Sequence, residues 1–168
     1  MDNKIRVCLI GSGFVGKKHA AAYRNQYNAK LQVVCDTNEN SAKILAEEYG
    51  FERVETDWHK AVSAEDVDLV CVCVPNNAHF EIVSETIKYG KHVSCEKPLG
   101  LNSSESEKLV KMAKEKGIIA TCCYNIIRVP AITYAQKIIK SGNLGKVVCF
   151  RGSYDNDRLA NPNAPFEW

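Results

Sequence analysis

Three glycines near the amino terminus have the spacing of a phosphate-binding turn. They follow directly after the apolar run Ile5–Ile10 and precede a stretch with helical spacing. In such a strand–turn–helix the first glycine permits the tight turn, the second lets the backbone approach a pyrophosphate, and the third allows close helix packing. The free N–H groups and the dipole of the helix favour an anion. The residues predicted to contact a dinucleotide here are Gly11, Ser12, Gly13, Phe14, Val15 and Gly16.

An acidic residue stands where such a turn needs one. Asp36 lies 36 − 16 = 20 residues beyond the last glycine, directly after the apolar run 31–35. Its carboxylate would accept hydrogen bonds from the adenosine ribose and repel the 2′-phosphate of NADP. The pattern predicts NAD, with Thr37 beside Asp36 as a further contact. NADP stays open because Thr37, Asn38 and Lys43 could accommodate a phosphate, and so does the reading of Asp36 as a cap for the next helix.

Two further polar segments follow apolar runs. The run 69–74 leads into Pro75, Asn76 and His79, and the run 92–95 leads into Glu96 and Lys97. Ligands of open α/β sheets bind outside the carboxyl ends of the strands. We therefore expect both segments to lie beside the glycine turn.

Together these motifs resemble the glucose-fructose oxidoreductase, inositol dehydrogenase and rhizopine catabolism (Gfo/Idh/MocA) family. Members carry a P-N-x-x-H segment, an E-K-P segment and an N-x-x-R-x-P segment in this order. The matching residues here are Pro75, Asn76 and His79, then Glu96, Lys97 and Pro98, then Asn125, Arg128 and Pro130.

The resemblance implies hydride transfer between a secondary alcohol of a sugar, glycoside or cyclitol and a nicotinamide. It makes Lys97 the catalytic residue that moves the hydroxyl proton, and Glu96 the group that orients Lys97 or the nicotinamide ribose. His79 is either a helix cap or a cofactor contact, and Arg128 either contacts substrate or anchors a helix. The implied cofactor contacts also include Val74, Pro75, Asn76, Lys97 and Asn125, and the implied substrate contacts are Lys97, Arg128 and Tyr154.

Alternating apolar runs and helical stretches indicate an α/β fold. Strands are predicted at 5–10, 31–35, 69–74, 92–95, 118–123 and 147–151, as continuous apolar runs typical of parallel strands covered on both faces. Ala42, Leu45 and Tyr49 form one apolar helix stripe. Ser104 and Glu107 have capping-box spacing before another helix. The sequence therefore predicts a Rossmann-type doubly wound parallel sheet.

The rhythm changes after about residue 123. We expect a dinucleotide-binding domain over 1–123 and, over 124–168, the truncated start of a second α+β domain, with a helix at 131–140. The resemblance implies that a full-length chain carries a further Asp and His beside the lysine and forms a homo-oligomer. A non-catalytic NAD(P)-binding module, half of a split enzyme, or another NAD(P) oxidoreductase with a similar domain remain alternatives.

The composition of the chain indicates which classes of binding partner to expect. The formal charge of the 168 residues is only +2, with basic residues spread along the chain, so we expect small-molecule partners and neither nucleic acid nor membrane. The start of the chain lacks signal-peptide features, which predicts a cytoplasmic protein. All eight cysteines fall in apolar runs and no C-x-x-C pair occurs, so we expect buried free thiols and no metal site.

Overall fold

The computed structural model describes residues 4–155, 157 and 163. The chain forms two compact units, 1–124 and 125–168. The last part of the predicted second domain lies outside the described residues, apart from 157 and 163. All the motifs from the glycine turn to Lys97 belong to the first unit.

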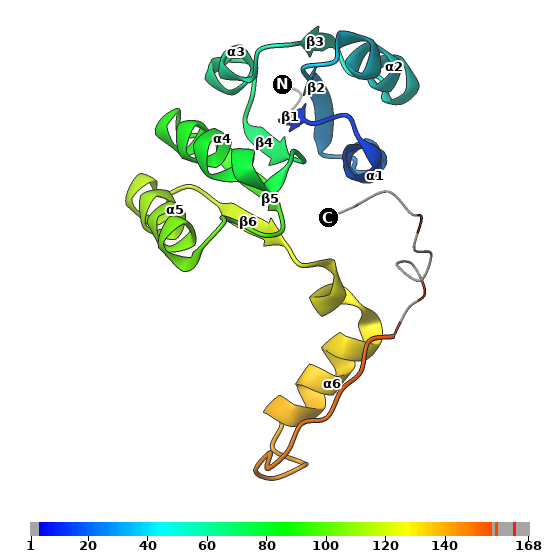
Figure 1. Ribbon diagram of the computed structural model, residues 1–168, viewed down its shortest axis with the longest axis vertical. Coiled ribbons are helices and arrows are strands. Elements are labelled where there is room, and N and C mark those ends of the chain that lie inside the picture. The colour runs from blue at the N-terminus through cyan, green and yellow to red at the C-terminus, as the bar shows by residue number, and fades with distance from the viewer. Residues whose placement is uncertain (1–3, 156, 158–162, 164–168) are drawn as a thin grey trace. The chain divides into compact units, whose positions relative to one another are not determined.

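The first unit is built on one sheet of six parallel strands in the order β3-β2-β1-β4-β5-β6 (Figure 1). The chain moves outward from β1 through β2 to β3, then returns to the other side of β1. The ends of β1 and β4 therefore meet at the topological switch point, where such sheets bind ligands. The strands are β1 (Ile5–Ile10), β2 (Ala29–Cys35), β3 (Arg53–Glu55), β4 (Leu69–Val72), β5 (His92–Glu96) and β6 (Ala120–Cys123).

Helices cover both faces of this sheet, which confirms the predicted doubly wound architecture. Buried residues of α1 and α2 pack on one face, and those of α3, α4 and α5 pack on the other. The helices are α1 (Phe14–Arg24), α2 (Glu39–Tyr49), α3 (Trp58–Ser63), α4 (Asn76–Lys88) and α5 (Ser103–Lys116).

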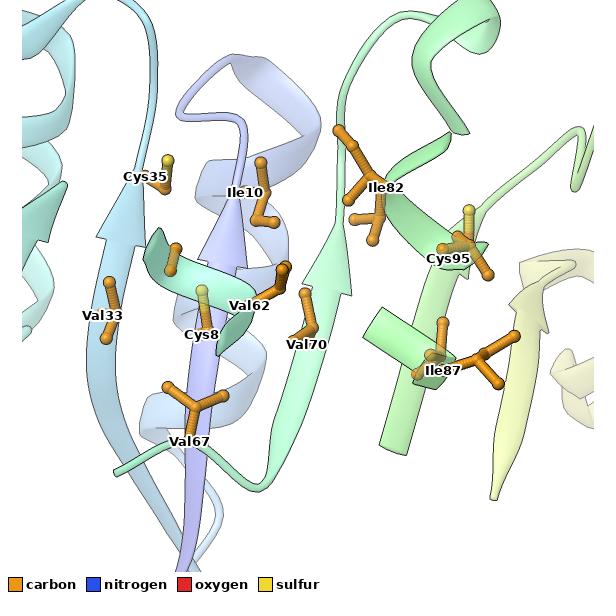
Figure 2. Close-up of a cluster of buried hydrophobic side chains, with 14 of the residues drawn as sticks. Cys8, Ile10, Val33, Cys35, Val62, Val67, Val70, Ile82, Ile87 and Cys95 are labelled. Atoms are coloured by element: carbon orange, nitrogen blue, oxygen red, sulfur yellow. The ribbon is translucent and has the colours of Figure 1, made fainter. Parts of the chain in front are cut away.

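Successive side chains of β1 enter opposite cores. Cys8 and Ile10 of β1 face the α3–α5 side together with Val70 of β4 (Figure 2), while Leu9 joins the α1–α2 core. Each of these side chains is at most 3 % exposed. Full burial of an aliphatic side chain contributes about 1.5–3 kcal/mol, so these two cores hold the strand ends in place.

Side chains cap the helices beside the sheet. Asn38 accepts a hydrogen bond from Ser41 N at the start of α2, and Gly50 ends that helix with φ at 83°. The predicted cap at Ser104 is wrong by two residues, because Asn102 accepts the hydrogen bond from Glu105 N. Ser104 lies within the first turn of α5, where its backbone is already helical.

The second unit contains a 3₁₀ turn, η1 (Asn125–Arg128), and α6 (Pro130–Lys140), which confirms the helix predicted there. The strand predicted at 147–151 is wrong, because these residues have no regular structure and are exposed. A strand needs a neighbour for its backbone groups, and the described residues offer 147–151 none. Within the described residues, no helix is long and apolar enough to span a membrane.

The expected burial of the cysteines is confirmed for part of the chain. All eight thiols are free. Cys149 is exposed, contrary to the expected burial, because the segment that carries it packs on no strand. The thiols that are buried are Cys8, Cys35, Cys71 and Cys95, and those that are half-buried are Cys73, Cys122 and Cys123.

Candidate functional site

The three glycines of the turn have different surroundings. Gly11 has φ at 99°, and a Cβ there would overlap the backbone carbonyl of Cys73; a Cβ on Gly16 would overlap the carbonyl of Gly11. A Cβ on Gly13 would meet nothing within 4 Å. Gly11 and Gly16 are therefore fixed by the fold, whereas the space over Gly13 is open to a ligand.

No side chain caps α1, whose N-terminal cap is Gly13. The first N–H groups of a helix have no partner within the helix, so here they remain available to a phosphate. Ser12 is buried and belongs to the turn, while Phe14 and Val15 are exposed at the start of α1. The turn thus offers backbone donors and open space, the two features that a pyrophosphate requires.

Asp36 is tied to the glycine turn. The backbone N–H and the hydroxyl of Ser12 both donate to Asp36 Oδ2 at 2.7 Å, and Asn38 N donates to Oδ1 at 2.9 Å. Partial burial raises the pKa of Asp36, but these hydrogen bonds outweigh it and hold the pKa below its ordinary value. A carboxylate has about four acceptor positions, so an ionised Asp36 retains capacity for a ribose hydroxyl.

Two of the three groups that could accept a 2′-phosphate are engaged within α2. Lys43 pairs with Glu39 one helical turn away at 2.7 Å, and Asn38 caps α2 through its side chain. Thr37 is exposed beside Asp36. The charged group at the carboxyl end of β2 is therefore the Asp36 carboxylate, and a negative charge at this place fits NAD and disfavours NADP.

His79 joins the two loops at the carboxyl ends of β4 and β5. Its buried ring lies between two backbone carbonyl oxygens, with Nδ1 2.6 Å from Pro98 O and Nε2 2.9 Å from Val74 O. Both ring nitrogens are thus used within the protein. His79 is neither an exposed helix cap nor a group with a free nitrogen, and it holds the loop after Lys97 against the loop after β4.

Glu96 is the last residue of β5, and Lys97 follows it directly. Glu96 Oε1 lies 2.8 Å from His19 Nε2 of α1, and Oε2 accepts a hydrogen bond from Lys97 N at 3.2 Å. The Lys97 side chain is exposed, and its peptide bond to Pro98 is cis. Glu96 therefore links α1 to the backbone of the lysine.

His19 was not singled out by the sequence. It lies one helical turn after Gly16, on the side of α1 that faces the sheet, and this periodicity is the only signal that could have marked it. The neighbouring Cys71 thiol raises the pKa of His19 to about 9, Glu96 adds to the effect, and burial opposes it. The same cluster lowers the pKa of Cys71, chiefly through the hydrogen bond from Cys73.

The remaining candidates lie at two places. Val74 and Asn76 are half-buried and Pro75 is exposed, all at the start of α4. Asn125, Arg128 and Tyr154 are exposed in the second unit. The first unit alone therefore brings together the glycine turn, Asp36 and the loops that follow β4 and β5.

Residues 5–124 match the model of an oxidoreductase family with an NAD-binding Rossmann fold, the Gfo/Idh/MocA family. The chain belongs to this family. The Gfo/Idh/MocA domain described here is accordingly an NAD-binding domain, in agreement with the geometry of the turn and of Asp36.

Similar proteins in the Gfo/Idh/MocA family include proteins named as dehydrogenases of sugars and cyclitols. Levoglucosan dehydrogenase of Pseudarthrobacter phenanthrenivorans is 35% identical over 98% of this chain and 44% of its own length. Myo-inositol 2-dehydrogenase of Thermotoga maritima is 30% identical over 84% of this chain and 42% of its own. A solved complex of levoglucosan dehydrogenase with NADH has a TM-score of 0.92 at 34% identity, over 98% of this chain and 46% of that one. This chain spans about half the length of these relatives.

Proposed function

We propose that this chain binds NAD for an oxidoreductase that transfers a hydride between a secondary hydroxyl of a sugar, glycoside or cyclitol and the nicotinamide. The observation that carries the proposal is the open backbone turn at Gly13 with Asp36 hydrogen-bonded to Ser12 beside it. The names of the relatives, dehydrogenases of an anhydrosugar and an inositol, support the substrate class.

The binding roles follow from the contacts in the first unit. The N–H groups at the start of α1 would hold the pyrophosphate, and Asp36 would accept a hydrogen bond from the adenosine ribose. Val74, Pro75 and Asn76 would line the cleft at the start of α4. His79 acts as a positioning residue, because it fixes the carbonyls of Val74 and Pro98 on the two loops.

Lys97 is the proposed catalytic residue. When bound, the nicotinamide supplies the acceptor for the hydride that leaves the carbinol carbon. Lys97 would take the hydroxyl proton as the carbonyl forms, which leaves no charge on the product oxygen. Glu96 accepts the hydrogen bond from Lys97 N and also pairs with His19, so it fixes the direction in which the lysine leaves β5.

The second unit supplies the remaining proposed contacts. Asn125 would face the nicotinamide, and Arg128 and Tyr154 would recognise substrate hydroxyls. Their exposed side chains carry hydrogen-bonding groups that suit a polyol. For a full-length chain, a homo-oligomer and a cytoplasmic location complete the proposal.

The test is the formation of NADH fluorescence when the chain and NAD are mixed with a panel of inositols, hexoses and glycosides. The proposal expects turnover with at least one of them, and a loss of about 100-fold or more after Lys97→Ala. Exposed Lys88, which pairs with Glu85 on α4, provides the matched control as Lys88→Ala. Silence toward every polyol, or unchanged turnover after Lys97→Ala, would contradict the proposal.

A further inference from the structure

A group of metal-ligand side chains lies on the α1 face of the sheet, next to the cofactor turn. Parallel register aligns Cys71 of β4 with Ser94 of β5, and Glu96 of β5 with Cys123 of β6. Residues aligned in this way point to the same face. Cys73 lies two residues beyond Cys71 and also packs on the α1 side.

His19, on the helix that covers this face of the sheet, also lies within reach of these side chains. A ligand atom of His19 and the Sγ atoms of Cys71 and Cys73 all lie within 4.8 Å of one another. His19, Glu96 and Cys123 satisfy the same condition. The two sets share His19: one adds Cys71 of β4 and Cys73 directly after it, and the other adds Glu96 of β5 and Cys123 of β6.

The distance between the Cys71 and Cys73 sulfur atoms matches the distance between two thiolates on one tetrahedral metal ion. Cys71 Sγ and Cys73 Sγ are 3.7 Å apart. Two thiolates bound to one Zn²⁺ at about 2.3 Å stand about 3.8 Å apart in tetrahedral geometry. The thiols therefore need almost no movement to become two ligands of one ion.

From this arrangement we infer a zinc site in which His19, Cys71 and Cys73 supply three ligands, with the fourth position taken by water. Glu96 Oε1 lies 2.8 Å from His19 Nε2 and holds that imidazole beside the thiols. Imidazole nitrogen and thiolate sulfur favour Zn²⁺ over Mg²⁺ or Ca²⁺, which prefer oxygen ligands. The ion replaces the thiol protons of the cysteines, which pass to solvent.

The site would connect three elements of the cofactor domain. His19 belongs to the helix that follows the glycine turn, Cys73 lies against Gly11, and Glu96, which pairs with His19, precedes Lys97. An ion held by His19, Cys71 and Cys73 would fix α1 to β4, and the pairing of His19 with Glu96 would connect both to the end of β5. Its expected effect on the cofactor-free chain is a higher temperature of unfolding.

The test uses the complete, reduced chain without cofactor, titrated with Zn²⁺ alone and, in parallel, with Co²⁺ as a spectroscopic substitute. We expect one Zn²⁺ per chain by native mass spectrometry and a sulfur-to-cobalt charge-transfer absorption. The variant Cys71→Ser/Cys73→Ser should lose about 100-fold or more in zinc affinity, and His19→Gln should weaken it as well.

The matched control is Cys95→Ser, a buried thiol of the adjacent strand that faces the opposite core. It should bind zinc as the unaltered chain does. The inference is overturned if the unaltered chain binds no zinc, if its cobalt form lacks the thiolate absorption, or if Cys95→Ser loses as much affinity as the double variant. The first two readouts use the unaltered chain, so they hold even if the double variant fails to fold.

Discussion

The glycine turn allows a prediction that separates folding from cofactor binding. Gly13→Ala adds a methyl group to open space at a residue with φ at −69°, which alanine adopts readily. The cost in unfolding free energy should be under about 1 kcal/mol, the difference between glycine and alanine at a helix cap. The methyl group would, however, occupy the space proposed for the pyrophosphate.

The expected loss of NADH affinity follows from the hydrogen bonds that this methyl group obstructs. A hydrogen bond to a charged group contributes about 1.5–3 kcal/mol, which corresponds to about 10- to 150-fold in Kd. Fluorescence titration with NADH measures this loss, and thermal unfolding monitored by circular dichroism measures stability.

Gly16→Ala provides the contrast. Its Cβ would overlap the carbonyl of Gly11, which cannot rotate away as a side chain could. Overpacking of this kind costs up to about 3 kcal/mol, a fall of about 6–12 °C in Tm for a chain of this size. The reasoning is refuted if Gly13→Ala lowers Tm as much as Gly16→Ala, or if Gly13→Ala binds NADH normally.

Three further predictions concern charged groups. Asp36→Ala should weaken NADH binding about 10-fold or more, because the ribose loses a charged acceptor, while Asp57→Ala at the cap of α3 should leave it unchanged in the same titration. Lys97→Ala should lower turnover about 100-fold or more while NADH affinity stays within a few-fold, and an equal loss of both would contradict its proton role. The hydrogen bonds from Arg6 outweigh burial and lower the pKa of Asp68 to about 2. The ionised Asp68 therefore stabilises the folded state fully above about pH 4, and this contribution is lost as the pH falls toward 2. Asp68→Asn should therefore cost at most about 1 kcal/mol at pH 7, since both side chains are more than a third exposed, and urea unfolding at pH 7 and 3 should show the deficit narrowing.

The sequence predicted the parts of the fold that carry a strong local signal. The runs that became β1 and β5 are apolar and short, and the stripe of Ala42 and Leu45 indicated α2 directly. β3 (Arg53–Glu55) and α3 (Trp58–Ser63) were not predicted, because each is too short for a periodic pattern. β3 is held by pairing with β2 and by Arg53, which binds Asp66 at 2.9 Å.

The sequence predicted those parts of the candidate site that depend on the spacing of residues within one local segment. Gly13 and Asp36 follow from spacing, and the structure adds the hydrogen bonds through Ser12 that join them. The contact of His19 with Glu96 spans 77 positions of the chain, and no local pattern contains such a pair. The prediction of a strand at 147–151 was wrong because an apolar run forms a strand only where the fold supplies a neighbouring strand.

The most direct test of the account is calorimetric titration of the purified chain with NADH and, separately, with NADPH. The account predicts one saturable NADH site per chain, with NADPH bound about 10-fold more weakly or worse because the Asp36 carboxylate would repel the 2′-phosphate. No heat of binding with either dinucleotide, or tighter binding of NADPH than of NADH, would contradict it.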